Sequence, residues 1–332
     1  MRKSKLFALA ASIALIAVST GFQLHSGFLS ASSAYAAQSS SDHQSIKAAP
    51  HKTFMWKVSS DKGTIYLLGS IHLVPPDFYP LPAEVEKAFD QSSDLVLEAD
   101  DTKVDPLKLQ TLMLSKSMYQ DGDNLQNHLS KDTLAALQQY CEKSGQAADK
   151  FMTMRPWFVG MMIPLLELQR QGFDAKLGID KHFQSKAQES GKAVGEVESA
   201  EFQMELISSF PDDLQEKLLK SSLLDVQDTK KEAAVMTNAW KNGNVADMEL
   251  LVTKDEREHP ELKVVSEKLI YDRNVNMEKK IEEYLDSGKS YFVVVGAGHL
   301  VGDRGIIKML KDKKYTVEQV IGAPAPTAKI AS

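Results

Sequence analysis

TIYLLGSIHL at residues 64–73 and FVVVGAGHL at residues 292–300 are two apolar runs, and each of them ends in the pattern Gly-x-x-His-Leu. Their β-branched and aromatic residues predict a buried strand, and the glycine lets the backbone turn sharply where that strand ends. The histidine three positions after the glycine, His72 or His299, is then expected over the edge of the sheet, where open α/β sheets bind ligands. Two such strand ends could converge on one metal ion or one substrate.

Two further apolar runs end in carboxylates. DLVLE at residues 94–98 predicts a buried strand that delivers Glu98, and KAVGEVE at residues 192–198 predicts a short strand that delivers Glu198. Parallel strands have their carboxyl ends at the same edge of a sheet. If these strands lie parallel to the first one, Glu98 comes to the edge that holds His72.

The two Gly-x-x-His motifs belong to similar units at the two ends of the chain. Residues 54–58 and 64–68 predict a hairpin, and residues 290–296, 302–310 and 315–320 predict a strand, a helix and a final strand. The sequence therefore predicts an α/β fold whose central mixed sheet is built from two split half-repeats.

Between these units the pattern is predominantly helical, from residue 105 to about residue 286. A helical insertion of about 180 residues is much longer than ordinary connections between elements. We expect it to cover the site and to shape the access of substrate. Residues 53–321 are then expected to form a single α/β domain that includes this insertion.

The N-terminus has the three parts of a secretory signal peptide: a basic start, an apolar stretch at residues 6–18 and the small-residue site Ala-Tyr-Ala at residues 34–36. We expect cleavage after Ala36, followed by a flexible leader at residues 37–52, and a flexible tail at residues 322–332. The apolar runs are too short for a bilayer-spanning helix. The mature protein is therefore expected to be secreted or otherwise extracytoplasmic, without stable membrane insertion; an uncleaved anchor is the alternative.

The net charge limits the binding partners of the protein, and the cysteine content limits its disulfides. Residues 1–36 carry three basic and no acidic residues, so cleavage changes the formal net charge from −6 to −9. Such a surface repels nucleic acid and anionic lipid. Cys141 is the single cysteine, which excludes an intrachain disulfide, and its helical pattern predicts a small core residue.

The edge residues His72, Glu98 and His299 form a candidate metal site. Imidazole nitrogens and carboxylate oxygens suit a borderline divalent ion and leave a position open for water. A bound metal would make that water a nucleophile, and a carboxylate outside the ligand set would act as general base. Glu98 and Glu198 are both candidates for this catalytic role, and the sequence leaves open which is ligand and which is base. In the alternative interpretation, the histidines cap loops and the carboxylates are solvated strand ends.

Other polar residues have weaker signals. Arg273, on a helix expected over residues 260–285, is a candidate catalytic electrophile, with a surface ion pair as the alternative. Asp180 is expected to cap the first turn of a helix rather than to bind metal. Ser70 lacks the G-x-S-x-G elbow and an obvious triad, which argues against a serine hydrolase.

At these residues the chain resembles the TraB/GumN (PrgY, Tiki) family over about residues 54–321. The resemblance is carried by the two Gly-x-x-His motifs and by YPLP at residues 79–82, LVLE at 95–98, RPW at 155–157, GID at 178–180, Glu198 with Gln203, WKNG at 240–243 and RN at 273–274. His72 and His299 match the motif histidines and Glu98 the motif glutamate, whereas Glu198 is added on strand-edge grounds. Ser70 stands where threonine is more usual.

The resemblance implies an α/β fold related to the erythromycin-esterase and ChaN group. It also implies an activity like that of Tiki proteins, which are metal-dependent proteases that use manganese or cobalt rather than zinc. We therefore expect an exported metal-dependent hydrolase, a peptidase that acts on a peptide or protein substrate near polypeptide termini. The alternative is a protein without turnover that sequesters a peptide, a metal or haem. An esterase acting on a macrolide-like lactone rests on fold analogy alone.

Overall fold

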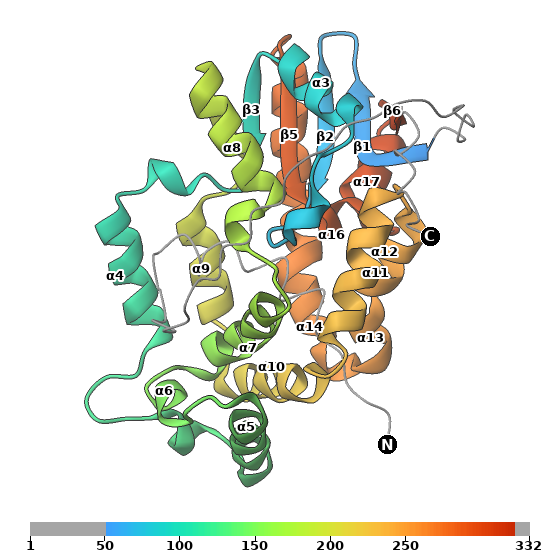
Figure 1. Ribbon diagram of the computed structural model, residues 1–332. Coiled ribbons are helices and arrows are strands. Elements are labelled where there is room, and N and C mark those ends of the chain that lie inside the picture. The colour runs from blue at the N-terminus through green and yellow to red at the C-terminus, as the bar shows by residue number, and fades with distance from the viewer. Residues whose placement is uncertain (1–50, 323–332) are drawn as a thin grey trace, which may run out of the picture.

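The computed structural model describes residues 51–322, and its centre is a six-stranded mixed sheet in the order β4-β3-β5-β2-β1-β6 (Figure 1). The strands are β1 (His51–Ser59), β2 (Thr64–Ser70), β3 (Asp94–Leu97), β4 (Val194–Glu196), β5 (Ser290–Gly296) and β6 (Thr316–Gly322). The α/β class and the mixed sheet expected from the sequence are therefore present. The expected signal peptide at residues 1–36, the leader up to residue 50 and the tail from residue 323 lie outside the described residues.

The ends of the described part of the chain differ slightly from the expected boundaries. β1 begins at His51 and pairs through it with Gly322 at the end of β6. Two residues of the expected leader and one of the expected tail are therefore strand residues, because they complete the antiparallel β1–β6 ladder.

Four neighbouring strands, β4, β3, β5 and β2, run parallel, whereas β1 is antiparallel to β2 and to β6. β1 and β2 form the hairpin that the sequence predicts. β2 and β5 pair without a shift along their whole length, so that Ser70 lies opposite Gly296. The two Gly-x-x-His motifs consequently leave the sheet side by side and in the same direction.

Helices cover both faces of the sheet. On one face, Phe292 of β5 packs against Phe89 of α3 (Ala83–Gln91) and Phe183 of α8 (Ile179–Ser190). On the other face, the neighbouring Tyr291 packs against Tyr284 of α15 (Asp272–Asp286). α17 (Ile306–Asp312) contacts α15 and β6. Because helices cover both of its faces, β5 has a continuous apolar sequence and not an alternation of apolar and polar residues.

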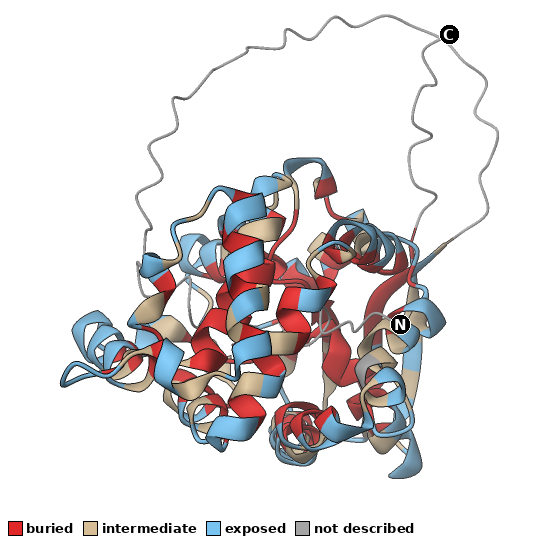
Figure 2. Cartoon of the chain, turned by 90° about the horizontal axis from the view of Figure 1, so that it is seen from below, coloured by how far each residue is buried: buried red, intermediate tan, exposed pale blue. Residues whose placement is uncertain are grey.

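Ten of the remaining helices gather beneath the carboxyl ends of the parallel strands (Figure 1). They are α4 (Pro106–Ser117), α5 (Lys131–Ser144), α6 (Asp149–Met152), α7 (Pro156–Arg170), α9 (Ala200–Ser208), α10 (Asp212–Asp225), α11 (Thr229–Lys241), α12 (Val245–Val252), α13 (Lys254–Glu258) and α14 (Lys263–Ser266). Seen from their side, these helices have exposed residues on their outer surfaces and buried residues beneath (Figure 2).

The segment expected as a helical insertion also takes part in the sheet. It contains β4, which is the edge strand beside β3, and it contains α8 and α15, which pack on the two faces. The helix expected over residues 260–285 is divided into the 3-10 turn Pro260–Leu262, α14, a π-helical turn at Glu267–Tyr271 and α15. The segment is thus part of one core with the terminal units.

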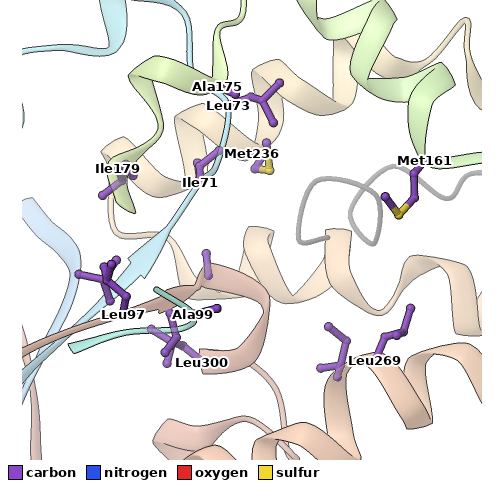
Figure 3. Close-up of a cluster of buried hydrophobic side chains, with 14 of the residues drawn as sticks. Ile71, Leu73, Leu97, Ala99, Met161, Ala175, Ile179, Met236, Leu269 and Leu300 are labelled. Carbon is purple, nitrogen blue, oxygen red and sulfur yellow. The ribbon is translucent and has the colours of Figure 1, made fainter. Parts of the chain in front are cut away.

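Apolar side chains separate the strand ends from solvent. Ile71 follows β2, Leu97 is the last residue of β3, and Leu300 lies four residues after β5. These three share one buried cluster with Met161 of α7 and Met236 of α11 (Figure 3). Polar groups placed beside this cluster are in surroundings of low dielectric, where charge interactions are strong. Among residues 51–322, the structure contains no helix with both the length and the apolar character that a membrane span requires.

Candidate functional site

The first Gly-x-x-His motif is a backbone loop that two helices hold in place. The indole Nε1 of Trp240, on α11, donates a hydrogen bond of 2.6 Å to the carbonyl oxygen of Gly69. The backbone N–H of Ile179, at the start of α8, donates to the carbonyl oxygen of Ile71 at 3.1 Å. His72 follows directly and is 4% exposed, so its ring has a fixed and buried position.

The imidazole of His72 is hydrogen bonded through one nitrogen only. Its Nδ1 lies 3.0 Å from Oδ1 of Asp180, which also accepts a hydrogen bond from the Ser70 hydroxyl at 3.0 Å. Nε2 is buried and has no hydrogen-bond partner among the described residues. Burial lowers the pKa of His72, but the charge and the hydrogen bond of Asp180 outweigh it, so that the pKa is raised above its ordinary value.

The second motif places His299 in the one-turn helix α16 (Ala297–Leu300), where the sequence predicts a turn. Its Nδ1 lies 2.6 Å from Oδ1 of Asn274, and the Nδ2 of the same amide donates to the carbonyl oxygen of Arg304 at 2.8 Å. Nε2 of His299 is also buried without a partner among the described residues. Burial, opposed by the charge of Glu98, lowers the pKa of His299 to about 3.

The two motifs and Glu98 meet at Gly296, at the end of β5. A Cβ atom placed on Gly296 would lie 3.2 Å from Oε2 of Glu98, 3.4 Å from Cδ2 of His299 and 3.9 Å from Nε2 of His72. Nε2 of His299 is 3.8 Å from Oε1 of Glu98. The expected convergence of His72, Glu98 and His299 is therefore present, beside the backbone of Gly296.

Arg273 joins the two glutamates at this edge of the sheet. Its Nη2 contacts Oε1 of Glu98 at 2.5 Å and Oε2 of Glu198 at 2.7 Å, and its Nε contacts Oε2 of Glu198 at 2.9 Å. The Nε2 of Gln203, on α9, donates to both carboxylates, at 3.0 Å and 3.3 Å. The expectation of a surface ion pair as the alternative for Arg273 is wrong, because its side chain is 4% exposed.

The two carboxylates are in different electrostatic surroundings. Burial raises the pKa of Glu98, but Arg273, His299, His72 and the backbone N–H of Gly296 together lower it to about 2. Burial dominates at Glu198, and its pKa is raised despite Arg273. Glu98 is thus held ionised, whereas Glu198 accepts a proton more readily than an ordinary glutamate.

All five residues that the sequence selects, namely His72, Glu98, Glu198, Arg273 and His299, therefore lie at one edge of the sheet. Three contributors that sequence reasoning did not assign to the site are Asp180, Asn274 and Gln203. Asp180 was expected as a helix cap, but α8 has no side-chain cap, and this carboxylate reaches His72 instead. The only sequence signal for these three residues is their place in stretches that resemble the family.

Three other histidines lie outside the site and pair with carboxylates. These pairs are His128 with Asp123 at 2.7 Å, His182 with Glu86 at 2.8 Å and His259 with Glu261 at 3.1 Å. Within residues 51–322, no group of three or more His, Cys, Asp or Glu side chains is placed so that it could hold a metal ion. Both oxygens of Glu98 accept hydrogen bonds from the protein, whereas the Nε2 atoms of His72 and His299 have no partner among the described residues.

The fold and the site together define a class: an α/β protein in which parallel strands of a mixed sheet end in two buried histidines and two buried glutamates. The family model of the TraB/PrgY/gumN family matches residues 54–319. The chain belongs to this family.

Two kinds of relatives illustrate the family. YbaP of Escherichia coli (strain K12) is 26% identical over 246 residues, which cover 74% of this chain and 87% of that protein. The proteins named metalloprotease TIKI1 of Xenopus tropicalis and Homo sapiens are each 23% identical over alignments that cover 82% of this chain. These alignments cover 62% of each TIKI1 protein, so the chain matches less than two thirds of their length. No match was found among solved structures.

Proposed function

We propose that this protein is an exported metal-dependent hydrolase, a peptidase that acts near the termini of polypeptide substrates. The observation that carries the proposal is the pair of buried, unengaged Nε2 atoms of His72 and His299, which face the same space beside Glu98. Buried polar atoms without a partner are rare in folded proteins, and a bound ion can satisfy them. The donor set of imidazole nitrogens and a carboxylate suits a divalent cation.

The charge balance of the site supports a cation at this place. Glu98, Glu198 and Asp180 are buried carboxylates, whereas Arg273 is the one buried Lys or Arg side chain among residues 51–322. Metal binding requires both imidazoles to be neutral, and with the carboxylates ionised the site then has an excess of negative charge. Buried charge without compensation is costly, and a divalent cation between the histidines would offset it.

In this proposal His72, His299 and Glu98 would hold the metal, which we expect to be manganese or cobalt rather than zinc from the resemblance to Tiki proteins. The bound metal would supply Lewis acidity and lower the pKa of a water molecule. Glu198 is the better candidate for general base, because its pKa is raised while that of Glu98 is lowered to about 2.

Arg273 would orient the two carboxylates. Its Nε and Nη2 donate to Glu198 and Glu98, and its Nη1 donates to the carbonyl oxygen of Leu269 at 2.9 Å. Since these three nitrogens already have acceptors, we propose a positioning role in place of the expected electrophilic one. The name metalloprotease of the TIKI1 relatives is consistent with the reaction class proposed for this chain.

The test is cleavage of a defined peptide library by the purified protein, read by mass spectrometry. We expect shortened peptides with added Mn²⁺ or Co²⁺, none with chelator, and at least ~100-fold slower cleavage by His72→Ala and His299→Ala because each removes a ligand. His259→Ala changes a histidine outside the site and should keep full activity. Equal cleavage by all three variants would refute the assignment.

A second candidate is a protein that sequesters its ligand without turnover, and the burial of both imidazoles, 4% and 0% exposed, favours it. In that case the same experiment returns every peptide intact while the protein still binds metal. A Soret band after mixing with haem would identify haem as the ligand.

We also propose that the fold is related to the erythromycin-esterase and ChaN group through two split half-repeats. The support is the unshifted pairing of β2 with β5, each of which leads into one Gly-x-x-His motif. A crystal structure that superimposes on neither group would contradict this relationship.

A further inference from the structure

We propose that Asp180 and Asn274 are positioning residues that hold His72 and His299 as Nδ1–H tautomers and thereby present both Nε2 atoms to one divalent cation. The presence of the cation rests on the function proposed above. The tautomers do not, because they follow from hydrogen bonds within the protein.

Asp180 determines the tautomer of His72. A carboxylate only accepts hydrogen bonds, so the 3.0 Å contact between its Oδ1 and Nδ1 requires the proton to be on Nδ1. The Ser70 hydroxyl donates to the same oxygen and fixes the carboxylate. Asp180 lies in the first turn of α8, beside the N–H of Ile179 that holds the motif backbone. The ring and its partner are therefore positioned by the same helix terminus.

Asn274 determines the tautomer of His299 in a different way. An amide has one donor end and one acceptor end, and the carbonyl oxygen of Arg304 can only accept. The 2.8 Å contact to Arg304 therefore assigns the NH₂ group to that side, and the oxygen of Asn274 faces Nδ1 of His299 at 2.6 Å. Nδ1 must donate, and the lone pair of His299 is on Nε2.

The backbone around Asn274 supports a functional role. Asn274 and Arg273 follow a π-helical turn at Glu267–Tyr271, and such turns are frequent at functional sites. These consecutive residues serve different parts of the site: Arg273 contacts the two glutamates and Asn274 contacts His299.

Asp180 carries a charge and Asn274 does not. Variants of these two residues can therefore separate the orientation of a histidine ring from its basicity as a metal ligand. A ligating histidine that donates to a carboxylate is a more basic ligand, and loss of such a partner typically weakens metal binding by about 10- to 100-fold. Asp180→Asn can keep both hydrogen bonds through its amide oxygen while it removes the charge. Asp180→Ala and Asn274→Ala remove the orientation itself.

The first experiment reads the tautomers directly, by ¹⁵N NMR of the metal-free purified protein labelled at histidine, with assignments from His72→Gln and His299→Gln. At an alkaline pH, at which both rings are neutral, we expect the Nδ1–H pattern for both rings in the wild type. Asp180→Ala should change the pattern of His72 alone, and Asn274→Ala that of His299 alone. The proposal is overturned if either ring carries its proton on Nε2 in the wild type, or if both alanine variants fold and leave both patterns unchanged.

The second experiment titrates Mn²⁺ by calorimetry. Asp180→Asn should keep the tautomer of His72 and raise the Kd about 10- to 100-fold. Asp123→Asn, which removes a carboxylate from the pair with His128 outside the site, should leave the Kd unchanged and serves as the matched control. An unchanged Kd in Asp180→Asn would overturn the effect proposed for its charge. Correct tautomers in a wild type that binds no metal would refute the proposed function and leave the positioning role standing.

Discussion

At the scale of single residues, two buried carboxylates depend on one guanidinium. Replacing Arg273 by Met leaves Glu98 and Glu198 without a positive partner in a buried place. We expect the free energy of unfolding to fall by about 3–5 kcal/mol, as is typical when one member of a buried ion pair is removed.

Urea denaturation of Arg273→Met measures this loss. The control is Arg170→Met, because Arg170 is 47% exposed and pairs with Glu167 at the surface. Its loss should be at most about 1 kcal/mol. Similar small losses in both variants would mean that the buried charges are compensated by another group.

The site residues that lie at the ends of strands could be predicted from the sequence. Glu98 directly follows an apolar run, His72 and His299 stand three residues after the glycine at the end of one, and Glu198 ends the short strand pattern at residues 192–198. The strand pattern therefore placed all four at the sheet edge. Asp180 and Asn274 could not be found in this way. Each stands on a helix and acts on a histidine in another part of the chain, 108 and 25 residues away, through a contact that only tertiary packing creates.

At the scale of elements, the start of α8 is packed tightly against the first motif. A Cβ atom on Gly178 would lie 2.4 Å from the carbonyl oxygen of His72. Gly178→Ala should therefore displace the motif, lower stability by about 1–3 kcal/mol and weaken metal binding.

Thermal unfolding and Mn²⁺ titration of Gly178→Ala test this prediction. Gly160→Ala is the control, because its Cβ would be 3.2 Å from the backbone of Leu219, between α7 and α10. It should lower stability without changing the affinity for metal. The same affinity in Gly178→Ala and the wild type would show that α8 does not position His72.

Contacts between Glu86 of α3 and two side chains of α8 also join these helices. Oε1 of Glu86 contacts Nε2 of His182 at 2.8 Å, and Oε2 contacts Nζ of Lys186 at 2.5 Å. Burial opposes ionisation of Glu86, but hydrogen bonds from His182 and Lys186 outweigh it, so the pKa is lowered from 4.5. A carboxylate with a lowered folded-state pKa stabilises the protein above its unfolded-state pKa, and this contribution is lost as the pH falls through the folded-state value.

The stability advantage of the wild type over Glu86→Gln should therefore shrink as the pH is lowered from 6 through the region below 4.5. Urea denaturation at a series of pH values measures it. Asp90→Asn, which changes a longer 3.4 Å contact to Lys186 at a more exposed position, is the matched control and should show a smaller change. An advantage of the wild type that grows on acidification would contradict the role of these contacts.

The strands were largely predictable as elements, and the connections between them were not. The hairpin, β3, β4 and β5 follow from short apolar runs bounded by turn residues. The position of β4 beside β3 depends on long-range pairing, which periodicity does not contain. The π-helical turn before α15 interrupts an apparently continuous helical pattern, and the sequence has no glycine or proline there to mark it.

At the scale of the whole molecule, the proposed site lies between the sheet and the helices beneath it, and the N-terminal segment is expected to direct export. When the full chain is expressed in cells that can export it, the exported protein should begin at Ala37. N-terminal sequencing or intact-mass measurement of the secreted protein tests this. A protein that retains residues 1–36 would support the uncleaved anchor instead.

The central claim is that His72 and His299, far apart in the sequence, bind one ion together. Anomalous diffraction from crystals of the protein prepared with Mn²⁺ tests it most directly. We expect one strong anomalous peak within bonding distance of both Nε2 atoms, and its loss in crystals of His72→Ala and of His299→Ala. A peak elsewhere in the molecule, or one that persists in either variant, would show that His72 and His299 do not bind one ion together.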